Sequence, residues 1–114
     1  MKPFTRRLVA LKCKVSPGGF SGERIFEVTL ADGKPYRSLA PRQFCWNTNR
    51  QIVAENEPSS EIEGMIAARV VDFIDEDQVL VEVPDSEIIA VDTDKVEERP
   101  SHIEPPESKL HVSV

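Results

Sequence analysis

The sequence predicts a single all-β domain, either a small partly open barrel or a two-layer sheet, with six to seven short strands. Short runs in which apolar and polar residues alternate recur along the chain, and this period of two is typical of half-buried strands. Clusters rich in Gly, Pro, Asp and Ser separate the runs, as expected for tight turns. The 114 residues, 39% hydrophobic and 30% charged, match one globular domain, which excludes a two-domain enzyme.

The first strand is expected over residues 6–15. Two lysines mark its solvent face, and its other face carries Val9, Leu11, Cys13 and Val15. The following segment, 16–22, contains a proline and three glycines, which end the strand in a turn. Phe20 in this turn is expected to cover one end of the barrel.

A hairpin is expected next. Phe26, Val28 and Leu30 alternate with polar residues, Asp32-Gly33 is a tight-turn dipeptide, and a second strand follows at 36–39. The tripeptides 26–28 and 81–83, Phe-Glu-Val and Val-Glu-Val, are alike. No repeated period accompanies them, so the sequence does not establish an internal duplication.

The middle of the chain is predicted to be irregular. Residues 41–49 are typical of a loop or short helical turn carrying two large aromatic side chains. Residues 51–54 are expected to form a short strand, and residues 55–60 a polar linker.

Residues 60–74 allow two interpretations. Ser60 and Glu63 form a capping-box pattern, and several later apolar residues fall near one helical face, which would give an α+β fold with one helix. Gly64 and the dense β-branched residues after it favour a strand buried on both sides. We favour the strand and keep the helix as the alternative.

Three short strands close the predicted domain as a meander. Turns are expected at 75–77 and 84–86, between the strand just described and further strands at 78–83 and 87–91. In strand length and meander order the chain resembles the SH3-like barrels. The resemblance is one of architecture only and implies no function.

The domain is expected to span residues 1–97, followed by a flexible tail, 98–114. Prolines at 100, 105 and 106 and several acidic residues oppose a packed element in the tail. Its last six residues, 109–114, nevertheless alternate and have the pattern of an edge strand that could pair with another copy.

Charge is distributed unevenly along the chain. Residues 1–50 carry ten Lys or Arg against three Asp or Glu, a charge of +7. Residues 51–114 carry four against seventeen, a charge of −13, which together give the net charge of −6. Such a dipole favours contact with a charged partner.

The apolar run at the N-terminus, 8–11, is shorter than a signal peptide requires, and the sequence contains no membrane-spanning stretch, so a cytoplasmic location is expected. Cys13 and Cys45 lack C-x-x-C spacing. Two reduced core cysteines are the favoured interpretation, with one disulfide as the alternative.

No catalytic, cofactor or metal motif stands out. Both histidines, His102 and His111, lie in the tail, and together with Cys13 and Cys45 they lack the short paired spacings of a zinc site. The glycine-rich turn has no following Lys-Ser/Thr, and the acidic residues do not match a calcium loop. We therefore expect no enzyme, no cofactor and no bound metal.

The most informative candidates combine basic and aromatic side chains. The predicted partner-binding residues are Tyr36, Arg37, Arg42, Phe44, Trp46 and Arg50. Such residue types are enriched at interface hot spots, so the leading hypothesis is a protein-binding or adaptor module, monomeric or weakly self-associating. Single-stranded nucleic-acid binding is the alternative, and a small carboxylate-dependent enzyme is a distant third. A simpler interpretation is that Phe44 and Trp46 only close the core.

Overall fold

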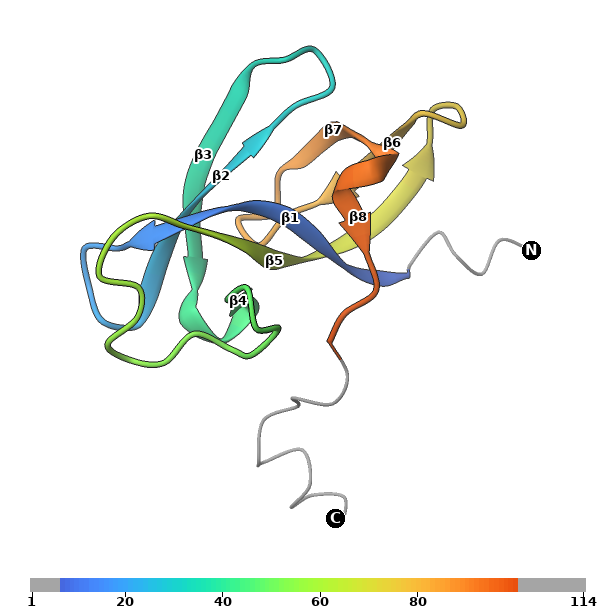
Figure 1. The fold of residues 1–114 in the computed structure, drawn as a ribbon. Helices are drawn as coiled ribbons and strands as arrows, with labels where there is room; N and C mark the ends of the chain where they lie inside the picture. Colours follow the sequence, from blue (N-terminus) through green and yellow to red (C-terminus); the bar gives the residue numbers. More distant parts are fainter. Residues whose placement is uncertain (1–6, 101–114) are drawn as a thin grey trace.

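The computed structural model describes residues 7–100, and within them the chain forms one curled antiparallel sheet, a half-barrel without α-helix (Figure 1). The strands are β1 (Leu8–Pro17), β2 (Glu23–Thr29), β3 (Pro35–Pro41), β4 (Cys45–Trp46), β5 (Ile62–Phe73), β6 (Gln78–Glu82), β7 (Ile88–Asp92) and β8 (Val96–Glu97). Two short 3-10 turns, η2 (Arg42–Phe44) and η3 (Thr93–Lys95), precede β4 and β8. The predicted all-β, partly open barrel is confirmed.

The long strands β1 and β5 form the central ladder of the sheet. They pair from Leu8 opposite Arg69 to Val15 opposite Ile62. The other edge of β1 carries β8 and β2 end to end, and the other edge of β5 carries β4 and β6. The β2–β3 and β6–β7 hairpins therefore lie on opposite sides of this ladder (Figure 1).

The two halves of the chain repeat the same architecture. Each consists of three strands, a 3-10 turn and a two-residue strand, and that last strand pairs with the first strand of the other half. The registers also correspond, because Lys14 faces Glu27 in the first half and Arg69 faces Glu82 in the second. The ladder is centred on Leu11 and Ile66, which face each other and are both fully buried.

The hairpin turns correspond as well. In each, an aspartate side chain, Asp32 or Asp85, accepts a hydrogen bond of 3.0 Å from the amide two residues later. The residue between, Gly33 or Ser86, has a positive φ, 89° or 76°. The similar tripeptides 26–28 and 81–83 therefore mark a true structural repeat, which the sequence alone did not establish because few other side chains recur.

The strand interpretation of residues 60–74 is confirmed as β5. Ile66, Ala68 and Val70 point to the inner core, while Met65 and Ala67 are buried on the outer face of the sheet. Burial on both faces explains why the segment lacks simple alternation. A bulge between β5 and β6 near Val70 adds to the curl of the sheet.

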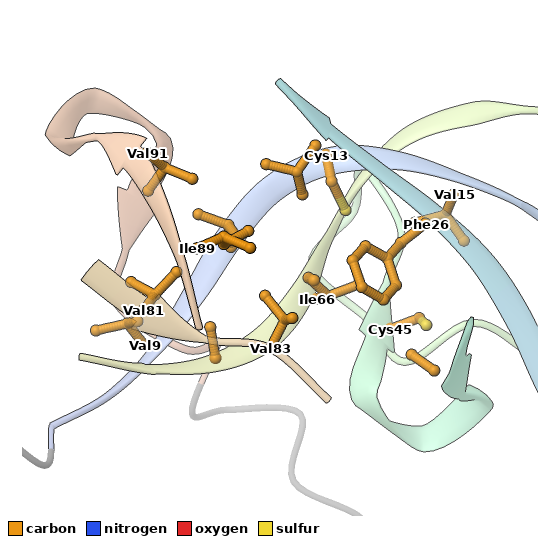
Figure 2. Close-up of a cluster of buried hydrophobic side chains, with 14 of the residues drawn as sticks. Val9, Cys13, Val15, Phe26, Cys45, Ile66, Val81, Val83, Ile89 and Val91 are labelled. Atoms are coloured by element: carbon orange, nitrogen blue, oxygen red, sulfur yellow. The ribbon is translucent and has the colours of Figure 1, made fainter. Parts of the chain in front are cut away.

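The inner core collects apolar side chains from every long strand. Figure 2 shows Ile66 between the β1–β2 side of the core, with Phe26, and the β6–β7 side, with Val81 and Ile89. Cys13 and Cys45 belong to this core and are both buried and unbonded, as the favoured interpretation expected.

One end of the half-barrel is organised by Arg24, which is 3% exposed. Its guanidinium donates five hydrogen bonds of 2.7–3.2 Å, all to backbone carbonyl oxygens, those of Ser21, Glu23, Ala54, Glu55 and Glu57. Phe20 does not cover this end, because its side chain is 77% exposed, and that expectation was wrong. This end is instead filled by the buried guanidinium of Arg24 and the loop carbonyl oxygens that accept its hydrogen bonds.

The expectation that residues 51–54 form a strand was also wrong. Among residues 7–100 this segment forms only one isolated bridge, between Trp46 and Ile52, although Val53 is fully buried. The carbonyl oxygens of this segment instead accept hydrogen bonds from the arginines at 24 and 42, which hold it as an irregular loop.

The chain stays on the domain beyond residue 97. Arg99 donates hydrogen bonds of 3.0 Å to the carbonyl oxygens of Val9 and Ala68, and Pro100 is buried. The rest of the predicted tail, 101–114, lies outside the described residues. Within 7–100, no helix has the length and apolar character needed to cross a membrane.

Candidate functional site

The six predicted binding residues do not share one surface. Tyr36 and Arg37 lie on β3 and contact neighbouring strands and turns. The Tyr36 hydroxyl donates a hydrogen bond of 2.5 Å to Oδ2 of Asp85, and Arg37 Nη1 lies 3.0 Å from Oε1 of Glu27. Both side chains are thus engaged within the domain.

Two further predicted residues, Arg42 and Arg50, hold loops in place. Arg42 Nη1 donates to the carbonyl oxygen of Val53 at 2.8 Å. Arg50 has a φ of 63° and places Nη1 3.2 Å from Oε1 of Glu97, on β8. Arg42 thus connects η2 to Val53, and Arg50 connects its own loop to β8.

The two aromatic residues near β4 differ in exposure. Trp46 is 7% exposed and packs against Ala10, Met65 and Ala67 on the outer face of the sheet. Phe44, at the end of η2, is 41% exposed. The interpretation that these aromatics close the core therefore holds for Trp46 but not for Phe44.

Phe44 borders a groove of about 330 Å³ that is the best candidate site in the described part of the chain. The groove lies between the start of β1, η2, the middle of β5 and the turn after β6. Its apolar lining is contributed by Leu8, Phe44, Ala67, Ala68, Val83 and Pro84. Its polar lining consists of Arg69, Glu82, Ser86 and Arg99.

The groove has an excess of positive charge. Arg69 Nε lies 3.8 Å from Oε1 of Glu82, whereas the two hydrogen bonds of Arg99 go to uncharged carbonyl oxygens. Burial, and secondarily the charge of Arg69, lower the pKa of the Arg99 guanidinium. Two guanidinium groups facing one carboxylate favour an anionic ligand group here.

Of the residues that line the groove, only Phe44 was among the predicted site residues, and Leu8, Arg69 and Arg99 were not. They are far apart in the sequence, so no local motif could group them. The one available signal was that Arg69 and Arg99 are two of only four basic residues in the acidic half of the chain.

The buried thiols are poorly suited to nucleophilic chemistry. Burial raises the pKa of Cys45 to about 12 and that of Cys13 well above its usual value, so both are protonated at neutral pH. Within residues 7–100, no group of three or more His, Cys, Asp or Glu side chains is arranged to hold a metal ion.

No protein-family model, no curated protein and no solved structure matches this chain.

Proposed function

We propose that this protein is a non-enzymatic binding module that holds a segment of a protein partner in the Phe44 groove. The partner segment carries an apolar side chain, which packs against Phe44 and Leu8, and a neighbouring carboxylate, which pairs with Arg69 and Arg99. The observation that carries the proposal is this apolar wall beside two guanidinium groups, with only one carboxylate among the lining residues that the structure describes. Arginine can bind a carboxylate through two parallel hydrogen bonds, which adds direction to the contact.

A protein partner is favoured over single-stranded nucleic acid. Nucleic-acid binding without sequence preference depends on exposed aromatic faces and a continuous basic groove. Of the aromatic candidates, Trp46 is buried and the Tyr36 hydroxyl is bonded to Asp85, while the whole chain carries a net charge of −6. A short acidic peptide needs only the local charge excess of the groove.

Selection from a random peptide library displayed on phage tests the proposal. Immobilised full-length protein should enrich sequences in which Asp or Glu stands beside Leu, Phe or Trp. A labelled peptide made from the enriched sequence should bind with an affinity that weakens by about tenfold or more in Phe44→Ser and in Arg69→Gln.

The matched control is Arg37→Gln. Arg37 and Arg69 are both exposed arginines that face a glutamate on the adjacent strand, but Arg37 lies outside the groove. Peptide binding that falls equally in this control, or enrichment of sequences without acidic residues, contradicts the proposal. Salt-dependent binding of an oligothymidylate with similar affinity would instead favour the nucleic-acid alternative.

A further inference from the structure

The apolar wall of the Phe44 groove is only partly covered by residues 7–100. Leu8 and Phe44, which form this wall, are 54% and 41% exposed. An exposed phenyl ring beside an exposed leucine is typical of a contact surface. Any further segment of the chain that covered this wall would compete with a partner for it.

Arg99 brings the chain to the floor of this groove. Val9 on β1 and Ala68 on β5 face each other, and Arg99 donates a hydrogen bond of 3.0 Å to the carbonyl oxygen of each. The guanidinium therefore lies over the seam between the two strands, where Ala68 also lines the groove. The next residue, Pro100, is buried, so the chain enters residues 101–114 from a position held beside the groove.

Residues 101–104 are long enough to reach the groove. Each extended residue spans about 3.3–3.6 Å, so these four residues cover at most about 14 Å. Glu97 on β8 faces Ala10 on β1, and Ala10 in turn faces Ala67, which lines the groove. Two strand spacings of about 5 Å therefore separate the backbone of β8 from the groove floor.

This part of the chain carries the pair of side chains that the groove fits. Ile103 is followed directly by Glu104, and in residues 101–114 no other large aliphatic residue adjoins an acidic one. The aliphatic side chain suits the wall formed by Leu8 and Phe44. The carboxylate suits the two guanidinium groups of the groove, which can bind it through paired hydrogen bonds.

Charge favours this segment over residues 1–6, which also adjoin the groove because they lead into β1. Residues 1–6 offer a phenylalanine, but with one lysine, one arginine and no acidic residue. Residues 101–108 carry two glutamates and no lysine or arginine. The lining residues that the structure describes include two guanidinium groups and one carboxylate, so the groove attracts the acidic segment and repels the basic one.

On the basis of the proposed function of the groove, we propose that Ile103 and Glu104 bind there within their own domain and compete with the partner segment. A short tether gives such a segment an effective concentration on the order of 1 mM, so even a weak contact between two side chains and the groove is formed in a sizeable fraction of molecules. A partner must displace the segment, which lowers the apparent affinity of weak ligands.

Full-length variants test the docked segment without a partner. Ile103→Ser with Glu104→Gln should shift the amide resonances of Phe44 and its neighbours in the groove, which are remote from the substitutions in sequence. The matched control, Leu110→Ser with Glu107→Gln, makes the same kinds of change further along the chain and should leave these resonances in place. Unchanged groove resonances in the first variant, or a difference that grows with protein concentration and so indicates a second copy, would overturn the proposal.

The labelled peptide selected against the groove separates the two proposals. It should bind the variant at 103 and 104 about threefold or more tightly than the wild type, because no tethered segment has to be displaced. The control variant should bind it as the wild type does. Equal affinities for all three proteins would overturn the competition and leave the groove as a binding site. Shifted groove resonances with no peptide binding to any of the proteins would instead keep the docked segment and refute the proposed function.

Discussion

The hydroxyl of Tyr36 on β3 donates a hydrogen bond of 2.5 Å to the carboxylate of Asp85 in the turn after β6, and so connects the two hairpins across the open side of the half-barrel. The Tyr36 ring also lies 6.2 Å from the ring of buried Phe26. This bond and the one from Ala31 to Ala90 are two contacts that hold the hairpins together where strand pairing is absent.

Replacing Tyr36 with Phe should destabilise the fold by about 1–2 kcal/mol, because the hydrogen bond to a charged group is lost while the ring packing stays. Burial, followed by the hydrogen bond and charge of Asp85, raises the pKa of Tyr36 from 10.0 to about 12. The neutral phenol is therefore favoured in the folded state. Its stabilising effect is complete below pH 10 and is lost as pH rises from about 10 to 12.

Urea unfolding of both proteins at several pH values measures this effect. The fall in unfolding free energy between about pH 10 and 12 should be smaller in Tyr36→Phe than in the wild type. At the acid end, burial opposes ionisation of Asp85, but hydrogen bonds from Ser38 and Tyr36 outweigh it and lower its pKa. That contribution is present above the usual aspartate pKa and is lost as pH falls through the lowered value. An unchanged alkaline profile in the variant would contradict this role of Tyr36.

Replacing Arg24 with Met should destabilise the domain by about 3 kcal/mol or more, because five carbonyl oxygens each lose a hydrogen bond in a site with little access to water. Within residues 7–100, only the carbonyl oxygen of Ala54 keeps another donor, the amide of Glu57. Arg24→Lys should recover only part of the loss, since an ammonium group has three donors. Thermal and urea unfolding measure both. The control Arg37→Met, which removes an exposed ion pair with Glu27, should change stability by less than about 1 kcal/mol.

Replacing Gly64 with Ala should loosen the contact between β4 and β5. An added Cβ would lie 2.5 Å from the carbonyl oxygen of Trp46 and 3.1 Å from Cγ2 of Val15, so the backbone of β4 must move. We expect a loss of about 1–3 kcal/mol and a change in the fluorescence of Trp46, the only tryptophan in the sequence. Gly22→Ala is the control, because no atom lies within 4 Å of its added Cβ.

The two cysteines should react with a thiol reagent only when the domain opens. Burial keeps both thiols protonated and removes them from solvent, so modification at about pH 8 should be slow in the native state and rapid in denaturant. Ellman's reagent measures both rates. Rapid reaction of one thiol in the native protein would show that the loop around Cys45 or the ladder at Cys13 opens locally.

The elements that the sequence predicted correctly are those whose burial is one-sided. The β2–β3 hairpin and β1 from Lys12 onward alternate clearly because one face meets the core and the other meets water, whereas Ala10 of β1 is buried under Trp46. β5 was harder to assign, since Trp46 covers its outer face and removes the polar half of the pattern. The segment 51–54 was mistaken for a strand because Ile52 and Val53 pack against apolar clusters. The carbonyl oxygens of Val53 and Ala54, however, accept hydrogen bonds from Arg42 and Arg24, which lie elsewhere in the sequence.

The candidate site was only partly predictable. Phe44 was predicted to be a binding residue from its type and neighbours and lines the candidate groove, whereas Leu8, Arg69 and Arg99, which line the same groove, come from three other parts of the chain. Tyr36, Arg42 and Arg50 were grouped with Phe44 by sequence distance, yet each bonds to a different part of the domain.

The sequence by itself determined the all-β class, most strand positions and the separation of charge between the two halves, because alternation and composition are properties of neighbouring residues. The tertiary structure alone decided that the halves repeat one architecture, that Trp46 is buried while Phe44 is exposed, and that Arg69 and Arg99 meet beside Leu8. These features depend on which strands pair and how strongly the sheet curls. Pairing and curl arise from contacts between residues distant in the chain, and no local pattern records such contacts.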